Sequence, residues 1–209
     1  MDFHETPSCG IVRCTMAAPV SVSHTHVYSM RLQSGREALV ARVLAADGSA
    51  GFGFTLNDDA GVARDMAAWD AAARVRNEPL YALLGGARRK VIAVLRDELP
   101  AIAPDWDALR KGIRDHRWKL LRLDPFAWGS LEKIHSIAAV AGSRAVALLA
   151  PNAHPWELAW CALLAATLPV ADAHVIVRVP PKEAAIAVSD RPGAGIDWPL
   201  EPAFAAIGW

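Results

Sequence analysis

Apolar and polar residues alternate along three stretches near the start of the chain, which is the pattern of half-buried β-strands. These stretches cover residues 20–32, 37–46 and 49–56. Gln33-Ser34-Gly35 indicates a turn after the first stretch. Asp47-Gly48, between the second and the third, is a strong hairpin signal. The pattern therefore predicts a three-stranded antiparallel meander.

A helix is predicted directly after the meander. Four apolar residues share one helical face at spacings of 4, 3 and 4: Val62, Met66, Trp69 and Ala73. Asn57 or Asp58 is the expected N-cap, because both side chains can accept a hydrogen bond from the first turn. A short helical turn at 80–84 is expected to end at Gly85-Gly86, a pair typical of a C-cap.

From Lys90 onward, short apolar runs alternate with helical segments. The runs begin at residues 91, 118, 145 and 174, so their spacings are 27, 27 and 29 residues. Helices are expected at 105–115, at 130–141 and between Pro155 and Pro169. This alternation predicts parallel βα units with right-handed connections. A full (βα)8 barrel needs about 250 residues, so the chain is expected to form three βα units and a closing strand.

These changes of pattern divide the chain into three parts. Residues 1–19 predict a loose arm, residues 20–88 the meander with its helix, and residues 89–181 the partial barrel. Residues 182–209 carry a Pro-Gly-x-Gly turn and are expected to return to the meander. The predicted fold class is α/β, or α+β for the chain as a whole.

Composition narrows the class of protein. The 209 residues (22.4 kDa) are 53% hydrophobic and 21% charged, which predicts a packed globular protein. The 22 basic and 22 acidic residues give a net charge of zero. A nucleic-acid binder needs surplus cations, so nucleic acid is not an expected partner. Zero net charge also leaves little repulsion against self-association.

The cysteines and the hydropathy pattern predict a reduced, cytoplasmic protein. Cys9, Cys14 and Cys161 are too few and too unevenly placed for a disulfide framework. A zinc site would have to combine Cys9 and Cys14 with His4, His24 and His26, and their spacings fit no common ligand pattern. No leader pattern stands at the start, and the longest apolar stretch, 158–168, is too short to span a bilayer. No membrane partner is expected.

Three segments resemble the enolase superfamily, in its mandelate racemase/muconate lactonizing enzyme branch. They are Met66–Gly86 (MAAWDAAARVRNEPLYALLGG), Asp47–Phe54 (DGSAGFGF) and Arg191–Trp198 (RPGAGIDW). The resemblance implies an α+β capping domain over a (βα)7β barrel, with both parts shortened here. It also implies proton abstraction next to a carboxylate by a Lys or His base, with Mg²⁺ stabilising the enediolate.

The residues that would carry this chemistry differ from the family pattern. Where the resemblance implies a Lys-x-Lys base motif on barrel strand 2, this chain reads Leu120-x-Arg122. Leucine carries no proton, and arginine stays protonated at working pH. Where it implies Asp-x-Asn on strand 3, the chain reads Ala150-Pro151-Asn152. Phe54 stands where the family's capping domain has a Glu.

Polar residues still follow the predicted strands, where sites form in barrel-like sheets. The catalytic candidates are Arg122, Asn152 and His154, and the substrate-binding candidates are Asp97, Glu98 and Asp124. No metal ligand is assigned. The alternative interpretation is ordinary loop polarity, with Asn152 or His154 at the start of the helix that Pro155 opens. Pairing of Arg122 with Asp124 or a surface carboxylate is the alternative role for that arginine. His135 lies on a helical face with Leu131 and Ile134, and it is expected to be an interface or half-buried histidine rather than a base.

Two functions remain open at this point. The first is a binding or structural homo-oligomer without the usual metal chemistry and without a cofactor, with a small carboxylate as a further ligand. The second is an active Mg²⁺-dependent racemase or dehydratase of hydroxy acids or acid sugars, with a rebuilt site. Self-association is expected because an open sheet would expose an apolar inner face. That face is predicted to hold Val91, Ala93, Leu95, Ala145, Ala147, Leu149, Val175, Val177 and Val179.

Overall fold

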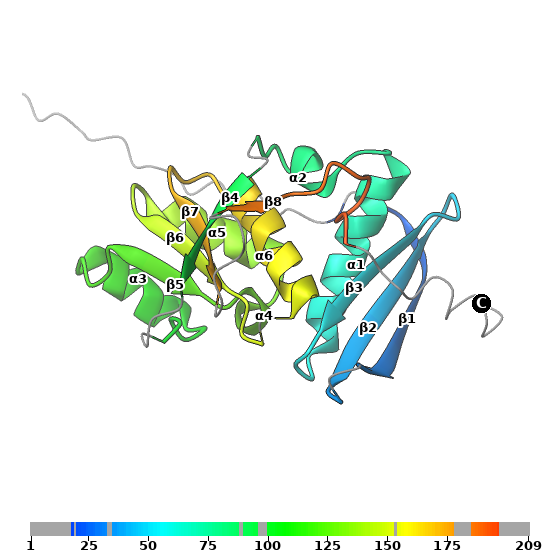
Figure 1. Ribbon diagram of the computed structural model, residues 1–209, viewed down its shortest axis with the longest axis horizontal. Helices are drawn as coiled ribbons and strands as arrows, with labels where there is room; N and C mark the ends of the chain where they lie inside the picture. The colour runs from blue at the N-terminus through cyan, green and yellow to red at the C-terminus, as the bar shows by residue number, and fades with distance from the viewer. Residues whose placement is uncertain are drawn as a thin grey trace, which may run out of the picture.

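The structure is a computed structural model that describes residues 18, 20–32, 35–87, 90–95, 100–152, 154–177 and 185–196. Within these residues the chain forms a three-stranded sheet and a five-stranded sheet. Figure 1 shows the three-stranded sheet with α1 at one side of the molecule and the five-stranded sheet at the other. No helix in the described ranges has the length and apolar character needed to cross a membrane.

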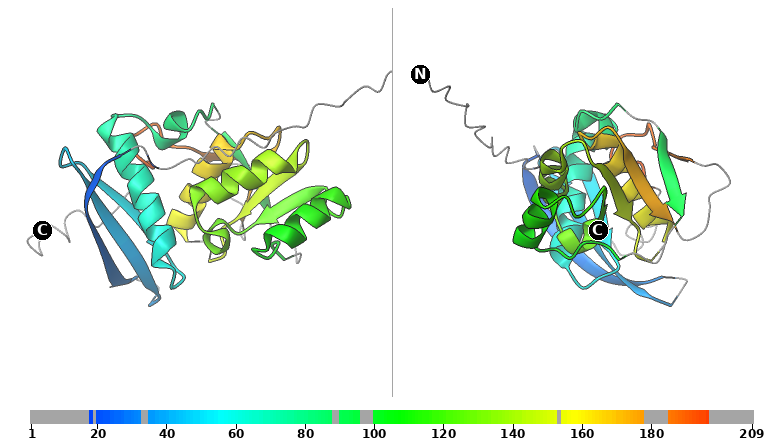
Figure 2. Two further views of the ribbon diagram at one scale, coloured as in Figure 1. Left: turned by 180° about the vertical axis from the view of Figure 1, so that it is seen from behind. Right: turned by 90° about the vertical axis from the view of Figure 1, so that its left-hand side faces the viewer.

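The predicted meander is confirmed. Its strands run antiparallel in the order β1 (Val22–Arg31), β2 (Glu37–Ala45) and β3 (Ala50–Thr55). The helix α1 (Ala60–Val75) follows and packs on β2 and β3 (Figure 2). Its N-cap is Asp59, whose carboxylate accepts from the Gly61 N–H, so the expected cap at Asn57 or Asp58 is wrong by one or two residues. The short helix α2 (Leu80–Leu83) ends before Gly85, as predicted.

Glycines in β3 bring its backbone into direct contact with α1. A Cβ added at Gly53 would lie 2.1 Å from the Ala63 carbonyl oxygen, and one added at Gly51 would lie 2.2 Å from that of Ala67. Real side chains do not fit at such distances. The Gly-x-Gly of the Asp47–Phe54 segment is therefore explained by close packing of helix on strand.

The alternation of strands and helices after residue 90 is also confirmed. The elements are β4 (Lys90–Leu95), α3 (Trp106–Arg114), β5 (Leu120–Leu123), α4 (Pro125–Trp128), α5 (Leu131–Ala141), β6 (Ala145–Leu149), α6 (Pro155–Thr167) and β7 (Ala173–Val177). The second strand begins two residues later than its apolar run. The one-turn helix α4 was not expected. It is capped by Asp124 and begins with proline, a favourable first residue because it needs no backbone donor.

The order of strands in the second sheet differs from that of a partial barrel of consecutive units. The order is β5-β6-β7-β4-β8, where β8 (Ala185–Ala187) is antiparallel to β4 and the other pairs are parallel. Consecutive units would place β4 beside β5. Instead β4 pairs with β7, the relation between the first and last strands of a closed ring.

The pairing register corrects the predicted inner face. Arg122 pairs with Ala147, Ala147 with His174, and His174 with Ile92, so these residues share one face. Val91 and Val175 lie on the opposite face and are 1% and 0% exposed. Residues 91, 93, 175 and 177 therefore do not share a face with 145, 147 and 149. Val179 lies outside the described residues. The solvent-facing apolar residues of β4 are Ile92 and Val94, which are 55% and 36% exposed.

Asp70 joins three parts of the chain. Its buried carboxylate accepts hydrogen bonds from the Phe52 N–H at 2.9 Å, the Ala194 N–H at 2.6 Å and the Arg74 Nε–H at 2.9 Å. Gly193 follows the path that this bond requires, with φ +81° and no room for a Cβ beside Asp70. The C-terminal segment therefore returns to α1, after β8 has added a strand to the second sheet.

Candidate functional site

Three of the predicted site residues gather at the carboxyl ends of β5 and β6. Asp124 directly follows β5 and caps α4. Asn152 lies three residues after β6 ends, and His154 is the N-cap of α6. Asp97 and Glu98 lie outside the described residues, so their role stays a prediction. Arg122 belongs to β5 itself and lines a pocket with Lys119 and Trp118.

Glu157 is the centre of this cluster, although the sequence pattern did not single it out. Its side chain is 1% exposed. Oε1 accepts from Asn152 Nδ2 at 2.7 Å, and Oε2 accepts from the backbone N–H groups of Asn152 at 2.8 Å and His154 at 3.3 Å. A Glu three residues after the N-cap is the reciprocal half of a capping box, so the spacing from His154 was the available signal.

Arg36 reaches this cluster from the other sheet. It lies one residue before β2, and its guanidinium donates to Asn152 Oδ1. The Asn152 amide thus accepts from Arg36 and donates to Glu157. The two residues of the first bond are 116 positions apart, and such a contact has no local sequence signature.

Aromatic side chains beside this cluster pack between the two structural units of the chain, namely the three-stranded sheet with α1 and the five-stranded sheet with its helices. Phe54 is fully buried and packs against Phe126 of α4 and Trp156 of α6, with ring centroids 5.7 and 5.3 Å away. The His154 ring meets Trp156 edge-on at 5.0 Å. The position where the resemblance implies a polar Glu is therefore part of an apolar contact between the units.

The carboxylate of Asp124 accepts hydrogen bonds from the backbone. Its Oδ1 accepts from the Phe126 N–H at 2.9 Å and the Ala127 N–H at 3.2 Å. Burial raises the pKa of Asp124, these two N–H groups oppose the rise, and the negative charge of Glu157 adds to it. The described contacts of Asp124 are those of a helix cap.

His154 is held as a neutral imidazole. Its Nδ1 accepts from the Trp156 N–H at 3.3 Å, which places its proton on Nε2. Burial lowers the pKa of His154, and the positive charge of Arg36 lowers it further. A neutral imidazole at this position can donate one hydrogen bond through Nε2.

The described residues do not fit a Mg²⁺ ion. Mg²⁺ prefers several oxygen ligands in an octahedron. In the described part of the chain, no three His, Cys, Asp or Glu side chains come together in a group that could hold a metal. Among the described residues, the carboxylates beside the ends of β5 and β6 are those of Asp124 and Glu157, and both already accept hydrogen bonds from N–H groups.

Comparison with known proteins identifies the fold. No family model matches the chain, and no curated protein sequence matches it. A solved mandelate racemase/muconate lactonizing enzyme from Bordetella bronchiseptica RB50 aligns over 90% of this chain and 99% of its own, with a TM-score of 0.66 and 14% identity. The chain has the mandelate racemase/muconate lactonizing enzyme fold. The resemblance found in the sequence is thus confirmed at the level of the fold.

Two further structures with this fold carry magnesium. A racemase from Streptomyces coelicolor A3(2) with bound magnesium aligns over 88% of this chain and 100% of its own, with a TM-score of 0.63 and 13% identity. L-Talarate dehydratase from Polaromonas sp. JS666, complexed with Mg and L-glucarate, aligns over 87% and 96%, with a TM-score of 0.63 and 14% identity. At these identities the likeness concerns the fold alone.

The segments that carry the sequence resemblance have structural roles in this fold. Met66–Gly86 contains Asp70, Asp47–Phe54 contains Gly51 and Gly53, and Arg191–Trp198 contains Gly193. Asp70 and Gly193 join the C-terminal segment to α1, and the two β3 glycines seat α1 on its sheet. The resemblance therefore lies in residues that hold the architecture together.

Proposed function

We propose that this chain is a shortened relative of the mandelate racemase/muconate lactonizing enzymes that has lost metal-dependent proton abstraction. It acts as a binding or structural protein and associates with further copies of itself. The main support for this proposal is what occupies the carboxyl ends of the strands, where the sites of such folds form. There Glu157 is buried within its own capping network, and Phe54 packs against Phe126 and Trp156.

The order of strands supports the same proposal. The resemblance implies a base on barrel strand 2 and metal carboxylates on strands 3, 4 and 5. Because β4 pairs with β7 as the first strand of a ring pairs with the last, the strands missing from this chain fall between β4 and β5 in ring order. Those are the strands that would carry the base and the metal ligands. In this ring order Leu120-x-Arg122 lies on a strand that follows the missing ones. The base motif is then absent from the chain, and Leu120-x-Arg122 does not stand in its place.

Metal binding tests the loss of chemistry. We expect no change in melting temperature when millimolar Mg²⁺ or Mn²⁺ is added, and no turnover across a library of hydroxy acids and sugar acids. A ligand at 100 times its dissociation constant adds about 2.7 kcal/mol to stability, so binding would be visible. Turnover of any acid in the library that EDTA abolishes would overturn the proposal.

Self-association is supported by the exposed apolar residues of β4. Ile92 and Val94 lie on the face opposite the buried Val91, and the chain has no net charge to oppose contact between copies. We expect light scattering to give a mass near twice 22.4 kDa or more. Ile92→Lys should dissociate the assembly. Val140→Lys, on the exposed surface of α5, is the matched control and should leave the mass unchanged.

A second candidate function is an active Mg²⁺-dependent racemase or dehydratase with a rebuilt site. The observation that favours it is the gathering of Arg36, Asp124, Asn152 and His154 near the carboxyl ends of β5 and β6. This candidate predicts turnover that His154→Gln and Arg36→Ala both abolish. The first proposal predicts no turnover in any of the three proteins.

A further inference from the structure

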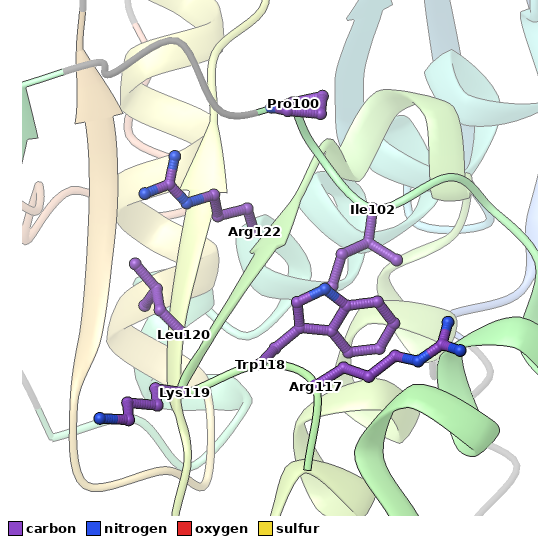
Figure 3. A pocket seen from close by; sticks show the side chains of 7 residues that line it. All are labelled: Pro100, Ile102, Arg117, Trp118, Lys119, Leu120 and Arg122. Atoms are coloured by element: carbon purple, nitrogen blue, oxygen red, sulfur yellow. The ribbon is translucent and has the colours of Figure 1, made fainter. Parts of the chain in front are cut away.

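We propose that a pocket beside the edge strand β5 binds a small organic molecule that carries two or more separated anionic groups. The pocket has a volume of about 320 Å³, close to the lower end of the range for small-molecule sites. Its apolar lining includes Ile102, Trp118 and Leu120, and its cationic lining consists of Arg117, Lys119 and Arg122 among the described residues. Figure 3 shows these side chains.

The pocket is formed by packed and hydrogen-bonded elements. The Ile102 N–H donates to the Arg122 carbonyl at 2.8 Å, which holds the segment before α3 against β5. The Trp118 ring packs on α3 at Gly112, where an added Cβ would lie 2.0 Å from the ring. The Trp128 Nε1–H donates to the Ile102 carbonyl at 3.3 Å. These contacts fix the apolar surface of the pocket before any ligand arrives.

The charge around the pocket has one sign in a chain of zero net charge. No acidic residue lines it in the described part of the chain. Within the same part, neither Arg117 nor Lys119 has a carboxylate within 4.0 Å, and the ion pair found there joins Arg74 to Asp70. Arginine guanidinium groups bind carboxylates and phosphates through paired hydrogen bonds, which favours an anionic ligand.

The directions of the three cations indicate the shape of the ligand. In Figure 3 the charged ends of Arg117, Lys119 and Arg122 point to different sides of the pocket, with Trp118 and Ile102 between Arg117 and the strand. A compact ion would reach one of these charges. A molecule with an apolar body and separated carboxylates or phosphates can contact the apolar lining and at least two of the cations.

This site is distinct from the cluster at the strand ends. Arg117, Trp118 and Lys119 precede β5, whereas Asp124 follows it. The inference stands independently of the proposed function, because neither metal binding nor turnover enters its argument.

Isothermal titration calorimetry on the full chain tests the proposal. The probes are the dicarboxylates from succinate to suberate for a carboxylate ligand, and fructose 1,6-bisphosphate for a phosphate ligand. Acetate and inorganic phosphate serve as single-anion probes. We expect saturable binding of at least one two-anion probe, weaker at 0.3 M than at 0.05 M salt. Whichever class binds more tightly identifies the anionic group.

Substitutions locate the binding. Arg117→Ala and Lys119→Ala should each weaken the best probe by roughly tenfold, because each removes one charge-assisted contact. Arg114→Ala removes an exposed arginine of α3 outside the lining and is the matched control, expected to bind as the parent chain does. The proposal is overturned if no two-anion probe saturates. It is also overturned if a single-anion probe binds as tightly, or if neither pocket variant weakens binding.

Discussion

Asp70 and Glu157 are both buried acidic side chains, but they hold different kinds of structure together. Asp70 binds its own helix, strand β3 and the Ala194 N–H, which is 124 residues away. Glu157 binds groups within five residues of itself, at the start of its own helix. The Asp70 region carries the sequence resemblance to the mandelate racemase/muconate lactonizing enzymes, and the Glu157 region does not.

This difference shows that residues resembling the family can be explained by their structural role, without any role in chemistry. The Asp70 contacts connect segments that would otherwise come apart, so the motif residues around it can be explained by structure alone. At the strand ends, Asp124 and His154 cap helices and Glu157 completes a cap. Polar residues at the end of a parallel strand indicate a site only when helix capping does not already account for them.

Among the substitutions considered, replacing Asp70 should have the largest effect on the free energy of unfolding. Asp70→Ala should lower the free energy of unfolding by about 3–5 kcal/mol, because it leaves the buried N–H groups of Phe52 and Ala194 without their acceptor and removes a buried charge partner. Urea denaturation measures this loss. Asp58→Ala, at an exposed position before α1, is the control. A loss below about 1 kcal/mol for Asp70→Ala would contradict the structural role given to this residue.

Acid titration extends the comparison to His135. Burial lowers the pKa of His135 to about 4, and its Nε2–H donates to Thr167 Oγ1, which itself donates to the Leu164 carbonyl. The unfolded chain takes up a proton near pH 6.5 and the folded chain does not, so stability falls as the pH drops from 6.5 to 4. The expected loss is about 3 kcal/mol.

Comparing His135→Gln with the parent chain isolates the contribution of His135 to acid sensitivity. Stability measured by urea at pH 7 and pH 4 should fall less in His135→Gln than in the parent chain. His24→Gln, on the exposed part of β1, controls for the loss of an imidazole. Equal acid sensitivity of His135→Gln and the parent chain would refute the assignment to His135.

Glu157→Ala tests whether the strand-end cluster is as structural as the Asp70 region. It removes the acceptor of the Asn152 and His154 N–H groups, and about 2 kcal/mol of unfolding free energy should be lost. The loss should be smaller than for Asp70→Ala because the bonds are local to one helix start. If Glu157→Ala leaves stability unchanged or raises it, the burial of this carboxylate serves another purpose, and the rebuilt-site candidate gains support.

Arg36→Ala should have the smallest effect on the free energy of unfolding. The guanidinium is exposed, and its bond to Asn152 links the two units at the surface. Exposed contacts of a charged side chain contribute about 0.2–1 kcal/mol, so the loss should stay within that range. Arg31→Ala, also exposed, is the control. A much larger loss would mean that the contact between the units depends on this one bond.

Local features were predictable because they depend on neighbouring residues. The alternation of the meander, the helical spacing from Val62 to Ala73 and the 27-residue period after Lys90 gave the right elements. The helix α4 escaped notice because a single turn has too few residues to show a period. At the candidate site, the cap at His154 was predictable from Pro155, whereas Arg36 was not, since its partner is 116 residues away.

By itself, the sequence determined the type, order and approximate bounds of most strands and helices, and the three segments that resemble the enolase superfamily. Only the tertiary structure decided that β4 pairs with β7, and that Ile92 rather than Val91 faces outward. The reason is physical. A strand that is apolar on both faces does not reveal which face is buried, and its neighbours are chosen by contacts across the whole chain.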